Sequence, residues 1–158
     1  MRLQRDLYDF YVKKAFKHRS FRAKHLNSPE MVKTSTHNIE VSVDVKYWDK
    51  QSIPRESHYF FVYFITIENK SDFSIQLTRR HWDIFDSIGD KREVNGEGVV
   101  GETPVIEPGQ KFQYNSGCNL TSEIGYMKGY YTLVKLIDNK EFQVEIPKFE
   151  LVVPAKMN

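Results

Sequence analysis

Apolar and polar residues alternate strictly between Ile39 and Tyr47, where every odd-numbered side chain is apolar or aromatic and every even-numbered one is polar. A period of two places each set on one face of a β-strand, so the pattern predicts a strand with one buried face. Residues 58–68 carry apolar groups in both sets, which is typical of a central strand that is covered on one face and partly shielded on the other. Further strands are predicted at residues 74–85, 111–114, 128–137 and 140–152.

Turn-forming residues separate these predicted strands. Asn, Asp, Ser, Pro and Gly gather at residues 69–72, 87–90, 108–109 and 138–139, where their backbone preferences favour tight turns. None of the intervening segments has the 3.6-residue period of a crossover helix. The order of elements therefore predicts an all-β fold, an antiparallel β-sandwich.

The first 30 residues follow a different pattern. Apolar positions recur at helical spacing over residues 2–24, with acidic residues early and basic residues late, and residues 27–29 (Asn-Ser-Pro) end the pattern. Residues 1–30 hold eight Lys or Arg and three acidic residues, a balance of +5 within a chain of net charge +2, which leaves −3 for the rest. We predict a short basic helical extension before a mildly acidic domain, and no nucleic-acid binding by the domain itself.

Length and composition limit the other classes of protein. A chain of 158 residues suits one core and a small appendage. No stretch approaches the roughly 20 apolar residues that cross a bilayer, and no secretory signal is present, so we expect a cytoplasmic protein without stable membrane insertion. Cys118 is the only cysteine, which excludes an internal disulfide and a cysteine-based zinc site. We expect no cofactor.

Three glycines, Gly96, Gly98 and Gly101, have the G-x-G-x-x-G spacing of dinucleotide-binding loops. That motif requires a helix directly after the glycines, because the free amides at a helix N-terminus receive the pyrophosphate. Residues 102–109 contain two prolines and no helical period. The spacing is better explained by backbone conformations that only glycine adopts readily. A weak anion contact through exposed amides remains the alternative.

Residues 79–82 (Arg-Arg-His-Trp) are the most informative candidate surface. In a regular strand Arg79 and His81 share one face, and Arg80 and Trp82 share the other, unless a bulge intervenes. Arg and Trp are frequent hot-spot residues at protein interfaces. The alternative is that Trp82 anchors the core with an arginine stem lying across it.

Catalytic and metal-binding residues are few. His81 beside Asp83 could serve as an oriented base, but no triad context accompanies it, and a packed, hydrogen-bonded histidine is the more common arrangement. The lone Cys118 is expected to be a small apolar group. The acidic residues Asp83, Asp86, Asp90 and Glu93 lack the order of a calcium loop, and turn acids explain them better. We therefore expect no enzyme and no metal site.

Several long segments of the chain resemble the ApaG family, also called CorD. They are residues 79–82, the glycine segment 96–102, Pro108-Gly109, Asn115 to Cys118 and Gly125 to Tyr130. The resemblance runs from about Met31 to near Val134 or beyond. It implies a fibronectin type III/immunoglobulin-like sandwich and a bacterial protein associated with magnesium and cobalt efflux and with a neighbouring diadenosine tetraphosphate hydrolase. In larger eukaryotic proteins the domain accompanies F-box modules, and no catalytic residue set is established for the family.

The chain is thus divided into residues 1–30, a basic helical extension or a segment upstream of a true start at Met31, and residues 31–158, the ApaG domain. We predict a non-catalytic interaction or regulatory module that contacts a protein partner through Arg79, Arg80, His81, Trp82 and the 96–102 segment. The alternative is a nucleotide- or pyrophosphate-binding protein that uses Gly96, Gly98 and Gly101. An exposed edge strand could also support a homodimer.

Overall fold

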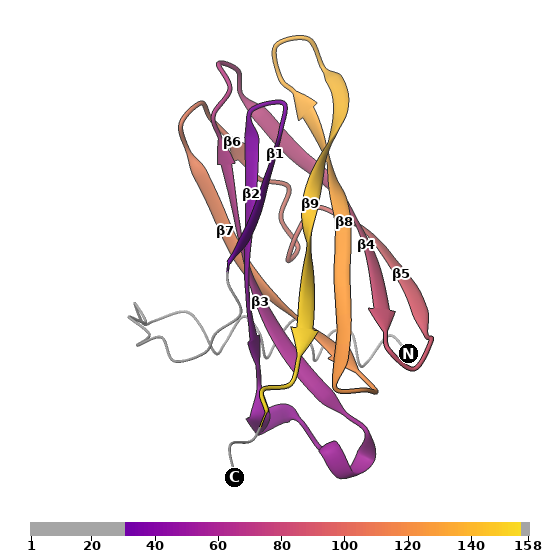
Figure 1. Cartoon of the computed structure of the whole chain (residues 1–158). Coiled ribbons are helices and arrows are strands. Elements are labelled where there is room, and N and C mark those ends of the chain that lie inside the picture. Colours follow the sequence, from indigo (N-terminus) through magenta and orange to yellow (C-terminus); the bar gives the residue numbers. More distant parts are fainter. Residues whose placement is uncertain (1–30, 156–158) are drawn as a thin grey trace.

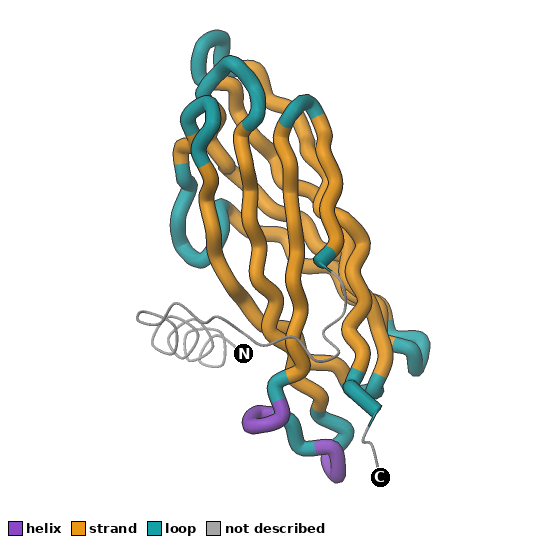
Figure 2. Tube along the Cα trace, turned by 60° about the vertical axis from the view of Figure 1, so that its left-hand side comes forward, coloured by secondary structure: helices purple, strands orange, loops and turns teal. Residues whose placement is uncertain are grey.

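The computed structural model describes residues 31–155, which form two antiparallel sheets packed face to face (Figure 1, Figure 2). The first sheet has the order β1 (Val32–Thr36), β2 (Ile39–Tyr47), β3 (Tyr59–Asn69) and β7 (Lys111–Leu120). The second has the order β5 (Lys91–Glu97), β4 (Ile75–Asp86), β8 (Ile124–Lys135) and β9 (Lys140–Val152), and β6 (Val105–Ile106) pairs with β4. The predicted antiparallel sandwich is therefore confirmed. The helix predicted over residues 2–24 lies outside the described residues.

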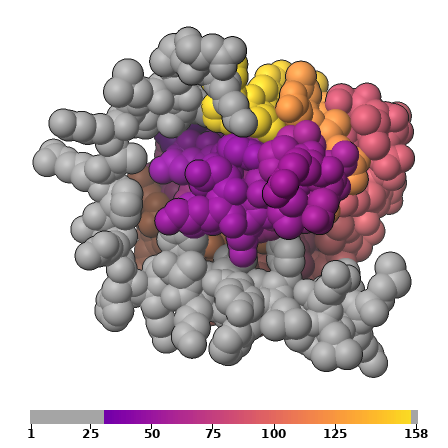
Figure 3. All heavy atoms as spheres, turned by 90° about the horizontal axis from the view of Figure 1, so that it is seen from below, coloured from indigo at the N-terminus to yellow at the C-terminus, as the bar shows by residue number. Residues whose placement is uncertain are grey.

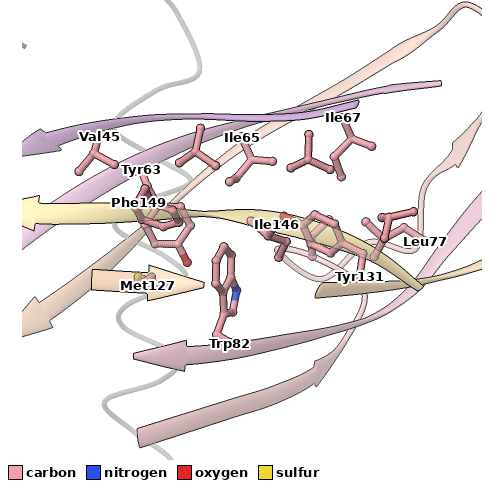
Figure 4. Packing of buried hydrophobic residues seen from close by; sticks show 14 of the residues in the cluster. Val45, Tyr63, Ile65, Ile67, Leu77, Trp82, Met127, Tyr131, Ile146 and Phe149 are labelled. Atoms are coloured by element: carbon pink, nitrogen blue, oxygen red, sulfur yellow. The ribbon is translucent and has the colours of Figure 1, made fainter. Parts of the chain in front are cut away.

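The alternation seen in the sequence produces the core. In β2 the odd-numbered residues from Ile39 to Val45 are all buried, and the polar residues between them face outward. Side chains of both sheets meet between the layers, where the rings of Tyr63, Trp82 and Phe149 lie 5.4–5.8 Å apart (Figure 4). Burial of these large rings is a main source of the sandwich's stability, because apolar area removed from water contributes roughly 25 cal/mol per Å².

A bulge in β4 reverses which residues face the core. Ile75 and Leu77 are buried, and the register against β8 shifts between Leu77 and Arg79. Beyond the shift Trp82 and Ile84 are the buried residues. One additional residue exchanges the two faces of a strand. The bulge that the sequence left open for this strand is thus present just before residues 79–82, and it decides which way their side chains point.

Two short 3₁₀ turns, η1 (Asp49–Gln51) and η2 (Pro54–Glu56), lie in the connection from β2 to β3. Seen from that end of the molecule, this purple segment lies over the end of the sandwich (Figure 3). Its backbone is fixed by Ser52, whose Oγ donates to Trp48 O and accepts from Phe60 N. Within residues 31–155, no helix has the length and apolar character needed to cross a membrane.

Some elements differ from those predicted. β7 continues to Leu120 instead of ending at residue 114, β8 begins at Ile124, and the strands β1, β5 and β6 were not predicted. β5 carries charged residues and Gly96, which obscure any alternation. β1 is recognisable only through its pairing with β2. Strands with little apolar content are therefore located by tertiary pairing and not by their own pattern.

Candidate functional site

The second sheet exposes one broad face of ordered polar and aromatic side chains. We call it the β4 outer face, formed by β4 residues Arg79, His81, Asp83 and Phe85 and their cross-strand neighbours. From β5 through β4 to β8 its rows are Glu97, Arg79 and Thr132; Asn95, His81 and Tyr130; Glu93, Asp83 and Lys128; and Lys91, Phe85 and Tyr126. No described strand or helix covers this face (Figure 1). A regular, uncovered array of this kind is suited to contact another molecule.

His81 lies at the centre of this face. Its Nδ1 is 2.7 Å from Asn95 Oδ1, its Nε2 is 3.1 Å from Asp83 Oδ1, and its ring stacks on Tyr130 with centroids 4.7 Å apart. The hydrogen bond to Asn95 and the bond to the Asp83 carboxylate raise the pKa of His81 against the effect of desolvation. Both ring nitrogens face oxygen atoms within the sheet, as in a packed and hydrogen-bonded histidine.

The four residues at 79–82 divide between two faces, as the alternation predicts. Arg79 is exposed and forms a 2.7 Å ion pair with Glu141. Arg80 points to the opposite side, where its Nη1 donates to the backbone oxygens of Glu97 (3.0 Å) and Gly98 (2.7 Å). Only Arg79 and His81 therefore belong to the β4 outer face.

Trp82 also points away from the outer face. It is 2% exposed and packs against Tyr63 and Phe149 in the core (Figure 4). Trp82 is therefore a core residue and not an exposed interface residue. Trp82 is accordingly not available to a partner at the surface.

The glycine spacing has a packing cause. Gly96 belongs to strand β5 and not to a loop, and a Cβ there would lie 3.0 Å from the Arg80 guanidinium carbon. Gly98 has a φ of +53°, and a Cβ there would lie 2.0 Å from the Glu102 carbonyl oxygen. Gly101 lies in a tight turn closed by reciprocal hydrogen bonds between Val99 and Glu102.

This segment has few free amides for an anion. The N–H groups of Gly98, Val99 and Glu102 already donate to backbone carbonyls. Val99 is fully buried in the core, and strand β6, not a helix, follows the segment. The Arg80 side chain donates hydrogen bonds to two carbonyl oxygens of this segment, those of Glu97 and Gly98. The segment is therefore built as a packed element of the sandwich.

The other residues singled out in the sequence do not converge. Cys118 is 4% exposed, and burial raises the pKa of its thiol. Asp86 faces inward and accepts hydrogen bonds from Thr121 and Ser122, while Asp83 belongs to the β4 outer face. Among residues 31–155 no three His, Cys, Asp or Glu side chains are grouped so that they could hold a metal ion.

Two shallow hollows on the β4 outer face both include Asp83 and Lys128. One, of about 500 Å³, contains Phe85 and Tyr126, whose rings stack with centroids 4.9 Å apart; the other, of about 550 Å³, contains Tyr130. Sequence reasoning missed Tyr126, Lys128 and Tyr130. The alternation of these three residues along residues 126–130 was the signal that could have identified them.

Comparisons with known proteins agree with this architecture. A family model described as the ApaG domain matches residues 49–135. Proteins named ApaG from Brucella canis and Methylorubrum extorquens are 46% and 45% identical to the chain, over 80% and 78% of this chain and 96% and 95% of their own lengths. The crystal structure of a Bordetella pertussis protein named ApaA superposes with a TM-score of 0.71 at 40% identity, covering 73% of this chain and 94% of that protein.

Proposed function

The chain belongs to the ApaG domain family, and we propose that it acts as a non-catalytic module that binds or regulates another protein through the β4 outer face. The observation that carries the proposal is the preformed, uncovered array centred on His81 and Tyr130. Its side chains are already ordered by hydrogen bonds and stacking, which reduces the entropy lost when a partner binds.

The composition of this face supports a protein partner. Stacked aromatic pairs alternate with Arg79 and Lys128, and protein interfaces are enriched in aromatic residues and arginine. The contact surface proposed from the sequence is retained for Arg79 and His81 and extended to Lys128 and Tyr130. The 96–102 segment lies beside it through the pairing of Glu97 with Arg79.

The fold type and biological setting belong to the same proposal. The strand orders β1-β2-β3-β7 and β5-β4-β8-β9, in two antiparallel sheets that face each other, support a fibronectin type III-like sandwich. We place the protein in the cytoplasm and relate its action to magnesium and cobalt efflux through a protein partner. The family resemblance is the support for this setting.

An affinity capture with matched variants tests the proposal. Lys128 is exposed and lines both hollows, whereas Lys50 is exposed in η1, away from the face. Lys128→Glu should reduce recovery of a specific partner from native lysate by about tenfold, equivalent to ~1.4 kcal/mol of binding free energy. Lys50→Glu should leave recovery unchanged, and both variants should melt like the wild type. Equal recovery by all three proteins would remove the proposed surface.

Nucleotide or pyrophosphate binding at Gly96, Gly98 and Gly101 is the alternative function. No observation favours it over partner binding, because three amides of the segment already donate to backbone carbonyls. Titration calorimetry with pyrophosphate and with diadenosine tetraphosphate at millimolar concentration separates the two functions. Heat that is lost in a Gly98→Ala variant would support the alternative and contradict our assignment.

A further inference from the structure

Strand β7 lacks the features that protect the other terminal strands. It is the last strand of the first sheet, and its outer edge pairs with no described strand (Figure 1). Proteins protect exposed strand edges with short length, charge, proline or bulges, because unpaired backbone groups attract other strands. β1 has five residues, β5 carries four charged residues, and β9 contains Pro147 and a register shift. β7 has ten residues, no proline and a single charged residue, Lys111.

Two hydrogen bonds define which backbone groups face outward. Trp48 N donates to Phe60 O at 2.8 Å, so the backbone of Phe60 is directed toward β2. Its cross-strand neighbour Asn119 is then directed away from β3, and Arg92 Nη2 donates to the Asn119 carbonyl from that side. Because neighbouring residues of a strand alternate in direction, the N–H and C=O groups of Gln113, Asn115 and Gly117 also face outward.

We propose that β7 pairs antiparallel with β7 of a second copy of this chain, joining the two four-stranded sheets into one continuous sheet. A two-fold axis at Asn115 places Gln113 opposite Gly117 of the second copy and Asn115 opposite its own counterpart. Residues 112–120 carry no charge, so no like charges oppose each other across the axis. The same edge serves both chains, as a two-fold interface requires.

The proposed pairing uses neither Lys128 nor His81, so it is independent of partner binding through the β4 outer face.

Light scattering during size-exclusion chromatography tests the pairing, since one chain has a mass of 18.7 kDa. The wild-type chain should be a dimer at micromolar concentration. Gln113→Pro removes an outward N–H that the pairing with a second copy would use and that β3 does not use, so this variant should be a monomer. It should still fold, because proline is tolerated on a free strand edge. Gln113→Ala keeps that N–H and should remain a dimer.

Asn115→Asp provides a second test with an isosteric side chain. Two carboxylates would face each other at the axis, so this variant should be monomeric at neutral pH and dimeric again when they are protonated. Circular dichroism and thermal melting verify that each variant is folded. A monomeric wild type, whether its edge is free, covered by the chain's own residues or bound to a different protein, would overturn the proposal. A dimer that persists in Gln113→Pro and Asn115→Asp would also overturn it.

Discussion

The two neighbouring arginines have the same chemistry and opposite structural roles. Arg80 donates two hydrogen bonds to the carbonyls of Glu97 and Gly98 on the inner side of β4, whereas Arg79 forms an ion pair on the exposed side. Hydrogen bonds to charged groups contribute ~1.5–3 kcal/mol, but exposed ion pairs contribute about 0–1 kcal/mol. The stability of the glycine segment should therefore depend on Arg80.

Arg80→Met should lower the free energy of unfolding by about 2 kcal/mol, since both carbonyls lose their donor. Arg79→Met should lower it by less than about 1 kcal/mol, the usual value of an exposed ion pair. Urea unfolding followed by tryptophan fluorescence measures both. Equal losses in the two variants would show that Arg80 does not hold the segment.

His81 should make the stability of the domain depend on pH. Its hydrogen bonds to Asn95 and Asp83 raise its pKa in the folded state, so protonation favours folding. The stabilisation is complete below the unfolded pKa of about 6.5 and is lost as the pH rises through the higher folded pKa. The wild type should therefore exceed His81→Gln in stability more at pH ~5.5 than at pH ~9, by up to about 1 kcal/mol.

Urea unfolding of the wild type and His81→Gln at both pH values measures this difference. The contributions of the titratable groups that both proteins share cancel in the comparison. An NMR titration of the imidazole gives the pKa directly. Asp83→Asn should bring that pKa closer to its ordinary value, because one of the acceptors loses its charge. A pH-independent difference between the wild type and His81→Gln would contradict the proposed protonation.

At the scale of elements, the glycine segment shows how a strand end is fitted to its neighbours. Gly98→Ala should cost about 2–4 kcal/mol, because the new Cβ would combine left-handed backbone strain with a contact to Glu102. Gly109→Ala is the matched control, since Gly109 has a φ of +79° and no heavy atom within 4 Å of a Cβ. Thermal melting compares them. Similar costs in both variants would mean that the contact with Glu102 is unimportant.

Element by element, the predictability of the fold follows the strength of the alternation. Residues 39–47 and 140–152 have the bounds that their pattern predicts, because one face of each strand is buried and the other is polar. The charged strand β5 was missed, since it is held by pairing with β4 rather than by its own apolar residues. The resemblance to the ApaG family, which several segments in the same order carry, is confirmed by the ApaG domain model that matches residues 49–135.

The candidate site was less predictable because it depends on register. Arg79 and His81 could be assigned to one face from alternation alone. The contact of His81 with Asn95 and Tyr130 requires three strands that are distant in sequence to be aligned. The inward direction of Arg80 and the burial of Trp82 follow from the bulge between Leu77 and Arg79, which no local pattern located to a single residue.

At the scale of the whole molecule, Asp86 ties the two sheets together. It ends β4 in the second sheet, and its carboxylate accepts from Thr121 N (2.6 Å), Thr121 Oγ1 (2.8 Å) and Ser122 Oγ in the turn that leads from β7 to β8. That turn carries the chain from the first sheet into the second. Asp86 is only 6% exposed, so these hydrogen bonds are shielded from water and lose little of their strength to it.

Asp86→Asn should lower the free energy of unfolding at neutral pH by about 2–3 kcal/mol, because an amide replaces a charged acceptor of several hydrogen bonds. Burial opposes ionisation of Asp86, but the hydrogen bonds from Ser122 and Thr121 outweigh it and lower the pKa. The stabilisation is thus present above the unfolded pKa of about 3.9 and is lost as the pH falls through the folded pKa. The difference between the wild type and Asp86→Asn should shrink accordingly on acidification, as urea unfolding at several pH values will measure. Asp90→Asn, in the exposed turn after β4, is the control and should hardly change the free energy of unfolding. If the difference in that free energy between the wild type and Asp86→Asn persists at low pH, the shape of the side chain, and not its charge, joins the sheets here.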